Sequence, residues 1–403
     1  MRFSFVIAAL AFLIALLLDW YIVSRIKKRC PGNTVIKKVY IVLAVLSYIV
    51  LTVGIALPRA SASNGYLVAD MWLLYAFVTT LVTRVAFCVW DWLSLIPRHF
   101  KLGWGKYLSY TGVIIALGVF GVTWWGALIN RNRISVTRFD VPSSQWPQAF
   151  DNFTIAQISD LHVGTWGNDT TFLSKLVERV NSLNPDMIVF TGDIVNREAD
   201  EFVPMVSTFS RLRAPFGVYA VMGNHDYGDY RYWENESDHK ADPIKLHELY
   251  ARTGHRLLLN ETEWIKKGND SIALIGVENI GDPPFHTYGD LNLAYPTLND
   301  SHPKILLSHN PAHWVNDIKD KRSADIALTL AGHTHAMQMQ VGHLTPATLR
   351  YPTAWGLYED SMGRYLFVNR GSGTVGMPMR IGATPEITLL TLKADTAHNN
   401  NKP

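Results

Sequence analysis

Four long apolar stretches fill most of the first 130 residues of this 403-residue chain, at about 3–23, 39–57, 66–90 and 108–129. A helix needs roughly 20 apolar residues to cross the hydrocarbon core of a bilayer, and each stretch approaches or exceeds that length. The first stretch also lacks the small-residue cleavage site of a signal peptide. The sequence therefore predicts an N-terminal bundle of about four transmembrane helices and a multi-pass integral membrane protein.

The third stretch is the least regular of the four because it carries Asp70 near its start and Arg84 in its interior. A charged side chain inside a membrane span is costly and points to a structural or functional partner. Three arrangements would satisfy Arg84: its head group reaches the bilayer surface, it faces a polar interior of the bundle, or it contacts an anionic ligand.

Charge divides the chain into two parts of opposite sign. Residues 1–130 contain 12 Lys and Arg against 3 Asp, a net charge of +9, and the remainder contains 25 basic against 31 acidic residues, a net charge of −6. Six basic residues lie in the first loop and three in the third, but the second loop has one. Because basic loops stay in the cytoplasm, four spans place the C-terminal part outside it. If the third stretch does not span, the C-terminal part is cytoplasmic instead. Its acidic balance argues against nucleic acid as a partner.

Five short apolar runs in the C-terminal part each lead into a loop with residues that can bind a metal ion. The loops read ISDLHVG, FTGDIVN, VMGNHDY, LLSHNP and LAGHTHA, and they supply Asp160, His162, Asp193, Asn224, His225, His309, His333 and His335. Short apolar runs bounded by Gly, Asn and Asp are typical of buried strands in an α/β sheet. Ligands of such sheets gather beyond the carboxyl ends of the strands, so these side chains are expected to converge.

The side chains offer nitrogen and oxygen ligands without a thiolate, which suits divalent ions such as Mn, Fe, Zn or Mg. Asp193 is a candidate bridge between two ions because each carboxylate oxygen accepts separately. Two adjacent ions clamp the attacking and leaving oxygens of a phosphoryl displacement and lower the pKa of a bridging water. His225, which follows Asn224, is a candidate acid for the leaving oxygen.

The series DLH, GD, GNHD, H and GHTH, in this order, resembles the calcineurin-like metallophosphoesterase superfamily, and the segment 363–392 resembles its bacterial membrane-associated branch. The resemblance covers roughly residues 150–392 and implies a metal-dependent phosphoesterase with a binuclear centre. By this resemblance, Asp160, His162 and His335 hold one metal, Asn224, His309 and His333 hold the second, Asp193 bridges them and His225 acts as the acid.

The chain departs from the family pattern at two places. After GD, many relatives carry an Asp that orients the acid histidine, whereas this chain has Asn196, and Asp226 is an alternative partner for His225. After GHTH, the membrane-associated relatives often have two glycines, whereas this chain has Ala336 and Met337. Neither departure removes a metal ligand. The first concerns the group that orients His225, and the second concerns the shape of the pocket edge.

The implied fold is α/β: the transmembrane bundle is followed by a metallophosphoesterase β-sandwich flanked by helices. The expected boundaries are a membrane anchor at 1–130, a polar connector at 131–149, the phosphoesterase domain at 150–394 and a disordered tail at 395–403. Helices are expected at about 169–183, 202–212, 243–251 and 312–319. The aromatic and charged insert 227–240 follows His225 so closely that it is expected to cap the metal site, with a solvated surface loop as the alternative.

The expected activity is hydrolysis of a phosphate ester on a phosphorylated small-molecule or lipid substrate close to the membrane lipid. The alternative among enzymes is a pyrophosphate hydrolase that acts on a nucleotide-linked lipid and needs a cytoplasmic catalytic domain. The alternative outside enzymes is a non-catalytic membrane sensor that uses the metal site for binding, since a fold does not guarantee its function. No motif in the sequence indicates a protein partner.

Overall fold

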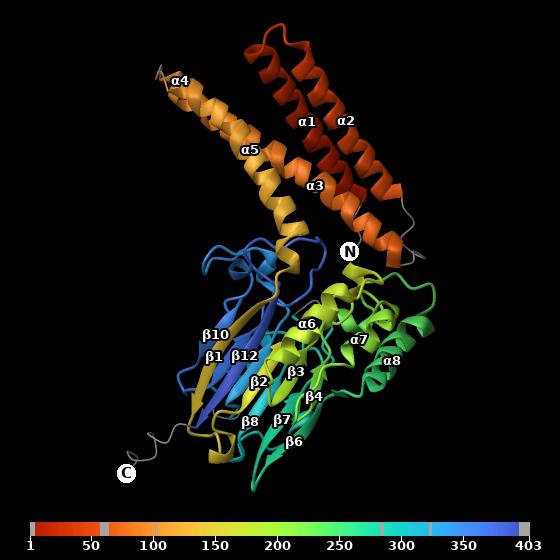
Figure 1. The fold of residues 1–403 in the computed structure, drawn as a ribbon, viewed down its shortest axis with the longest axis vertical. Helices are drawn as coiled ribbons and strands as arrows, with labels where there is room; N and C mark the ends of the chain where they lie inside the picture. The colour runs from red at the N-terminus through yellow and green to blue at the C-terminus, as the bar shows by residue number, and fades with distance from the viewer. Residues whose placement is uncertain are drawn as a thin grey trace. The chain divides into compact units, whose positions relative to one another are not determined.

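The computed structural model describes residues 5–56, 64–100, 102, 104–282, 286–321 and 325–394. The chain folds into two compact units: the first comprises Met1–Ile129 with the short segment Gly376–Met379, and the second comprises Asn130–Val375 and Arg380–Pro403. The first unit consists of long helices, and the second contains strands with helices beside them (Figure 1). The tail 395–403, expected to be disordered, lies outside the described residues.

Long apolar helices make up the first unit. They are α1 (Phe5–Arg29), α2 (Thr34–Ala56), α3 (Asn64–Leu93), the short α4 (Leu95–His99) and α5 (Gly105–Leu128). Within the described part of the chain, four segments are long and apolar enough to cross a membrane: Val6–Arg29, Thr34–Ala56, Tyr66–Pro97 and Tyr110–Asn132. The prediction of four long apolar helices is therefore confirmed. The third is one continuous helix through both Asp70 and Arg84.

Arg84 is buried inside the helical unit and pairs with an acid. Its Nε atom lies 2.8 Å from Asp19 Oδ1 of α1, and its Nη2 atom donates to Ser47 Oγ of α2 at 2.7 Å. Tyr40 and Tyr48 of α2 also donate hydrogen bonds to the Asp19 carboxylate. Of the three arrangements expected for Arg84, the structure shows the polar bundle interior, and this cluster connects α1, α2 and α3.

Two six-stranded sheets form the framework of the second unit. Their strand orders are β1-β12-β2-β3-β4-β5 and β10-β11-β9-β8-β7-β6. The strands are β1 (Ser135–Ser143), β2 (Thr154–Ile158), β3 (Met187–Thr191), β4 (Val218–Val221), β5 (Arg256–Leu257), β6 (Glu261–Lys267), β7 (Asp270–Gly276), β8 (Lys304–Leu307), β9 (Leu328–Ala331), β10 (Gly356–Glu359), β11 (Tyr365–Val368) and β12 (Glu386–Ala394). β2, β3 and β4 are parallel neighbours, as are β7, β8 and β9, so the carboxyl ends of each trio lie at one edge of its sheet.

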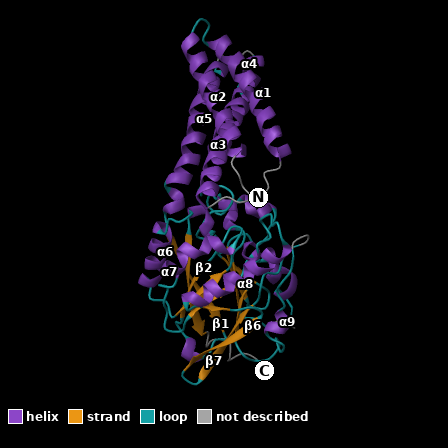
Figure 2. Ribbon diagram, turned by 90° about the vertical axis from the view of Figure 1, so that its right-hand side faces the viewer, coloured by secondary structure: helices purple, strands orange, loops and turns teal. Residues whose placement is uncertain are grey.

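Apolar side chains between the two sheets form one core, and helices cover the outer faces. Ile155 and Val189 of the first sheet share a buried cluster with Leu307 and Leu328 of the second. The outer face of the first sheet packs against α6 (Thr171–Ser182), α7 (Val206–Phe209) and α8 (Glu236–Thr253). Figure 2 shows these helices beside the strands. The outer face of the second sheet packs against Trp314 and its neighbours, and a short helix, α9 (Leu291–Ala294), contributes to that cluster. The predicted β-sandwich flanked by helices is confirmed.

Several expected elements differ from those observed. The segment 131–149 is not a connector, because it contains β1, which pairs in parallel with β12 at the edge of the first sheet. The helix expected at 243–251 begins at Glu236, so it takes up the end of the insert 227–240. The helix expected at 202–212 is a 3-10 segment (Ala199–Met205) followed by α7, and that expected at 312–319 is a π-helical turn (Trp314–Ile318).

Candidate metal centre

The polar loops after β2, β3 and β9 turn sharply because several of their residues adopt left-handed backbone conformations. These residues are Asp160 (φ 54°), His162 (φ 43°), Asp193 (φ 59°), His333 (φ 74°) and His335 (φ 50°). Positive φ is uncommon for residues other than glycine, and such conformations cluster at functional sites. The loops, rather than the strands, therefore set the directions of these side chains.

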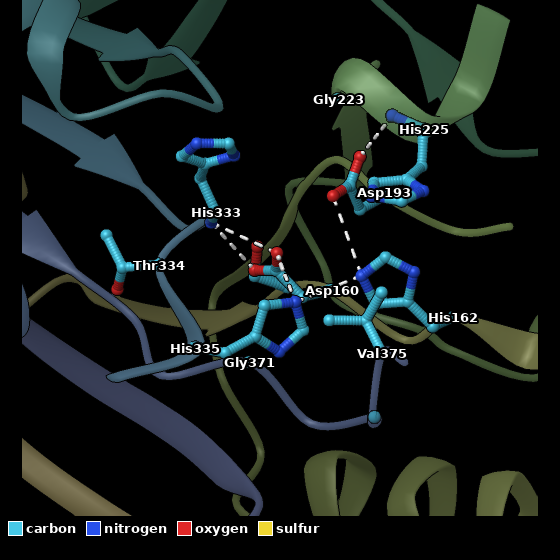
Figure 3. Close-up of polar contacts among 12 residues, drawn as sticks. Asp160, His162, Asp193, Gly223, His225, His333, Thr334, His335, Gly371 and Val375 are labelled. Carbon is cyan, nitrogen blue, oxygen red and sulfur yellow. Dashed lines mark hydrogen bonds and ion pairs between the residues drawn. The ribbon is translucent and has the colours of Figure 1, made fainter. Parts of the chain in front are cut away.

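Four buried side chains form the first group of potential ligands: Asp160, His162, Asp193 and His335. His335 Nε2 lies 3.2 Å from Asp160 Oδ1 and 3.0 Å from His162 Nε2. His162 Nε2 in turn lies 3.5 Å from Asp193 Oδ2. Figure 3 shows the His162 and His335 rings directed toward the two carboxylates. The main-chain N–H of His333 donates to both oxygens of Asp160, at 3.0 and 3.1 Å, and so fixes this carboxylate.

Asp193 also belongs to a second group, with His309 and His333. His309 Nε2 lies 3.2 Å from Asp193 Oδ2. The Asn224 amide joins this group, because its Oδ1 atom lies 3.1 Å from His309 Nε2 and 2.8 Å from His333 Nδ1. The structure thus brings all seven predicted ligand residues together in two groups that share Asp193.

The donor atoms of these groups fit divalent cations. His162 Nδ1 donates to the carbonyl oxygen of Val195 at 3.1 Å, and burial lowers the pKa of His162 to about 3, so its Nε2 atom carries a lone pair. His309 Nδ1 likewise donates to the carbonyl oxygen of Thr191 at 2.7 Å. Burial by itself would lower the pKa of His309, but the negative charge of Asp193 raises this pKa to about 9. The proton that His309 then holds supplies the positive charge that a bound cation would supply. Lone pairs and carboxylate oxygens this close repel one another unless a positive charge lies between them.

His225 lies at the edge of the cluster, and the main chain orients its ring. Its N–H donates to Asp193 Oδ1 at 2.8 Å, and its ring Nδ1 donates to the carbonyl oxygen of Asn196 at 2.7 Å. The Tyr230 ring stacks on the His225 ring with a centroid distance of 3.9 Å. With Nδ1 engaged in this bond, Nε2 is the ring nitrogen that remains for a further contact.

Asp226, the alternative partner expected for His225, has a different role. Its carboxylate accepts hydrogen bonds from the main-chain N–H groups of Asp193, Ile194, Val195 and Gly223 at 2.8 to 3.2 Å. It therefore holds the loops that carry the ligands, and the carbonyl oxygen of Asn196 orients His225 instead. The Asn196 side chain itself bonds to Thr165. The replacement of the family Asp by Asn196 thus leaves the histidine with an orienting hydrogen bond.

Two glycines are required because the carboxylates approach their backbone closely. A Cβ atom at Gly223 would lie 2.2 Å from Asp193 Oδ1, and one at Gly332 would lie 2.3 Å from Asp160 Oδ2. Both contacts are far shorter than a carbon and an oxygen tolerate. The glycines of GNHD and GHTH therefore leave the space in which the carboxylates sit.

Two tyrosines outside the sequence motifs contact the second group. Tyr230 OH accepts a hydrogen bond from Asn224 Nδ2 at 2.7 Å, and Tyr351 OH lies 2.9 Å from His333 Nε2. No motif indicates Tyr351. Tyr230 lies in the insert 227–240, so the insert contributes at least one ring to the edge of the cluster.

A cavity of about 210 Å³ adjoins Tyr351. Its lining residues are Asp282, Ala312, Val315, Asn316, Arg350, Tyr351, Pro352 and Thr353. The exposed Arg350 guanidinium lies 3.9 Å from Asp282. The lining therefore combines apolar side chains with polar and charged ones.

Comparison with known proteins agrees with this geometry. Residues 153–337 match the Calcineurin-like phosphoesterase family. The Uncharacterized metallophosphoesterase YkuE of Bacillus subtilis is 30% identical over 303 residues, which cover 74% of this chain and 97% of that protein. A Transmembrane protein with metallophosphoesterase domain of Bos taurus is 33% identical over 264 residues, covering 64% of this chain and 57% of that protein. The UDP-2,3-diacylglucosamine pyrophosphatase LpxG of Chlamydia muridarum is 28% identical over 330 residues, covering 71% and 97%.

This chain belongs to the calcineurin-like phosphoesterase family, as its motifs predict. Its described residues include a cluster of potential metal ligands and four helices long and apolar enough to span a membrane. The chain spans about three fifths of the length of the vertebrate relatives it matches.

Proposed function

We propose that this protein is a membrane-anchored, two-metal hydrolase of phosphate bonds, and that its substrate is lipid-linked or lies close to the membrane. The observation that carries the proposal is the position of Asp193, which is shared by two groups of ligand-type side chains. One carboxylate shared between two sets of imidazoles is the arrangement that a binuclear centre needs.

In this proposal, Asp160, His162 and His335 hold one divalent ion, Asn224, His309 and His333 hold the other, and Asp193 bridges them. When bound, two adjacent ions stabilise charge on a phosphoryl group and lower the pKa of a water molecule. The protein fixes the ligands through main-chain contacts: the His333 N–H holds Asp160, and the His225 N–H holds Asp193. Mn, Fe, Zn and Mg all suit these nitrogen and oxygen ligands.

His225 is the proposed acid that protonates the leaving oxygen. The hydrogen bond from its Nδ1 to the Asn196 carbonyl directs Nε2 away from the loop, and the Tyr230 ring restricts rotation of the imidazole. A fixed ring within reach of the cluster meets the geometric requirement for proton transfer.

The membrane helices and the similarity to LpxG, whose name states a lipid-nucleotide pyrophosphatase, support an amphiphilic substrate. The cavity beside Tyr351 offers Arg350 and Asp282 for polar groups next to the scissile phosphate. A phosphate monoester or diester of a lipid is the first candidate. The pyrophosphate of a nucleotide-linked lipid is the second candidate, and the similarity to LpxG is the observation that supports it.

Turnover by the full chain in detergent tests the proposal. The substrates are an aryl phosphate, a bis-aryl phosphodiester and UDP-diacylglucosamine, each assayed with Mn²⁺ and with a chelator. We expect metal-dependent hydrolysis that Asp193→Ala abolishes and that Asp140→Ala, a change at an exposed Asp of β1, leaves intact. Equal hydrolysis by Asp193→Ala and the unaltered protein would exclude the bridging role.

A further inference from the structure

The loop of residues 336–350, which follows the last predicted metal ligand, exposes apolar side chains to its surroundings. The relative exposures are 52% for Met337, 38% for Met339, 77% for Val341, 78% for Leu344 and 92% for Leu349. Single exposed apolar residues are common on proteins, but five within thirteen positions form an unusual concentration.

Three polar side chains of the same loop are directed inward, whereas His343, Thr348 and Arg350 are exposed. Gln338, Gln340 and Thr345 are buried. Gln338 exchanges two hydrogen bonds with the main chain of Val375, and Gln340 Oε1 accepts from Arg370 Nη1 at 3.0 Å. From Met337 to Val341, exposed apolar and buried polar residues alternate strictly. This pattern is the reverse of what a water-facing loop shows.

The backbone of the loop fixes this inverted arrangement. Ala336, Met337 and Gln338 all have positive φ (49°, 47° and 57°), a conformation that residues other than glycine adopt only when their surroundings enforce it. Val341 and Leu344 then exchange main-chain hydrogen bonds at 2.9 and 3.0 Å, which closes a tight turn with both apolar side chains outward. The backbone conformation of the loop therefore sets the exposure of these apolar side chains, and rotation of the side chains alone would not bury them.

We propose that the loop 336–350 contacts the hydrocarbon–headgroup boundary of the lipid bilayer. The fourth candidate membrane span ends at Asn132, and β1 of the second unit begins at Ser135, so only two residues separate them. Insertion of that span into a bilayer would keep the second unit within a short reach of lipid, and lipid offers an apolar medium for the exposed side chains of this loop. Transfer of exposed Val, Leu and Met side chains from water into that boundary lowers the free energy of the system.

Both ends of the loop are adjacent to residues of the metal cluster. It begins directly after His335, and it ends at Tyr351, whose OH group lies 2.9 Å from His333 Nε2. Contact of the loop with lipid therefore brings the cluster to the level of phosphate headgroups. This consequence rests on the proposed function, whereas the membrane contact itself does not.

Lipid quenching of site-specific fluorophores tests the contact in the full chain. With Cys30 and Cys88 changed to Ala, single cysteines replace Val341, Leu344 or Leu349, and each is labelled with a polarity-sensitive fluorophore. Leu293→Cys is the matched control, because Leu293 is an exposed leucine (67%) of α9 in the same unit. The proteins are reconstituted into phosphatidylethanolamine–phosphatidylglycerol vesicles that contain acyl-chain doxyl lipid.

Quenching and a blue-shifted emission at positions 341, 344 and 349, without either effect at 293, support the proposal. Equal signals at all four positions overturn it. An absence of lipid quenching at these positions also overturns it. If, in that case, the labels of two copies quench each other, a second copy of the chain covers the loop instead of lipid. The measurement involves no turnover, so its failure and failure of the proposed activity are distinguishable.

Discussion

The side chain of His225 is close to the metal cluster, but its ring nitrogen Nδ1 bonds to a main-chain carbonyl, so acid catalysis and metal binding are separable at this residue. We expect His225→Ala to lower turnover by about 10²–10⁴-fold, the usual contribution of a general acid, and to retain its metal. Turnover and metal content are measured on the same preparation, with the exposed His286→Ala as control. Loss of metal together with activity would make His225 a ligand.

Tyr351 offers a second test at the scale of one residue. Its OH group lies 2.9 Å from His333 Nε2, a contact that fixes the imidazole with Nδ1 toward the cluster. Partners of this kind typically affect metal affinity by about 10–100-fold. We therefore expect Tyr351→Phe to weaken binding of one of the two ions, as measured by metal titration. Tyr358→Phe removes a hydroxyl that bonds to the Trp355 main chain and should leave both affinities unchanged.

The candidate ligands were predictable from sequence because each follows a short apolar run, and parallel strands end at the same edge of a sheet. Tyr230 and Tyr351 were not predictable, because a tyrosine in a loop has no spacing that marks it. The role of Asn196 was also hidden, since its main-chain carbonyl, rather than its side chain, orients His225. Roles of the main chain leave no trace in residue identity.

Among the elements, the membrane helices and central strands were predictable because long apolar runs and short buried ones are unambiguous. Strand β1 was missed because edge strands carry polar residues and Pro142 suggested a connector. Pro is tolerated in such a strand, where one side of the backbone has no partner in the sheet. The early start of α8 was hidden by Pro243, which lies within the helix.

The ion pair of Asp19 and Arg84 predicts how the helices of the first unit depend on one another. Asp19→Ala leaves the buried Arg84 without its counter-charge, and loss of one partner of a buried pair costs about 3–5 kcal/mol. We expect a clear fall in the thermal stability of the full chain in detergent. The double change Asp19→Ala with Arg84→Leu removes the unpaired charge and should recover part of that loss. If the loss of stability of the double variant equals the sum of the losses of Asp19→Ala and Arg84→Leu measured singly, the two residues are not energetically coupled.

At the scale of the whole molecule, the charge asymmetry predicts the side of the membrane on which catalysis occurs. The first loop carries six basic residues and the second carries one, and the described part of the chain has four helices long and apolar enough to span a membrane. Because basic loops are retained in the cytoplasm, an even number of spans places the catalytic unit outside it. The pyrophosphatase candidate, by contrast, needs a cytoplasmic catalytic unit, so the location also bears on the substrate.

Thiol labelling with a membrane-impermeant reagent decides this orientation. Cys30 follows α1 in the basic first loop and serves as the cytoplasmic reference in a Cys88→Ala protein. A second protein carries Cys30→Ala, Cys88→Ala and Lys240→Cys, which places a thiol at an exposed position of α8. In spheroplasts we expect position 240 to react at once and Cys30 to react only after the membrane is opened. The opposite pattern would place the catalytic unit in the cytoplasm and favour the nucleotide-linked lipid as substrate.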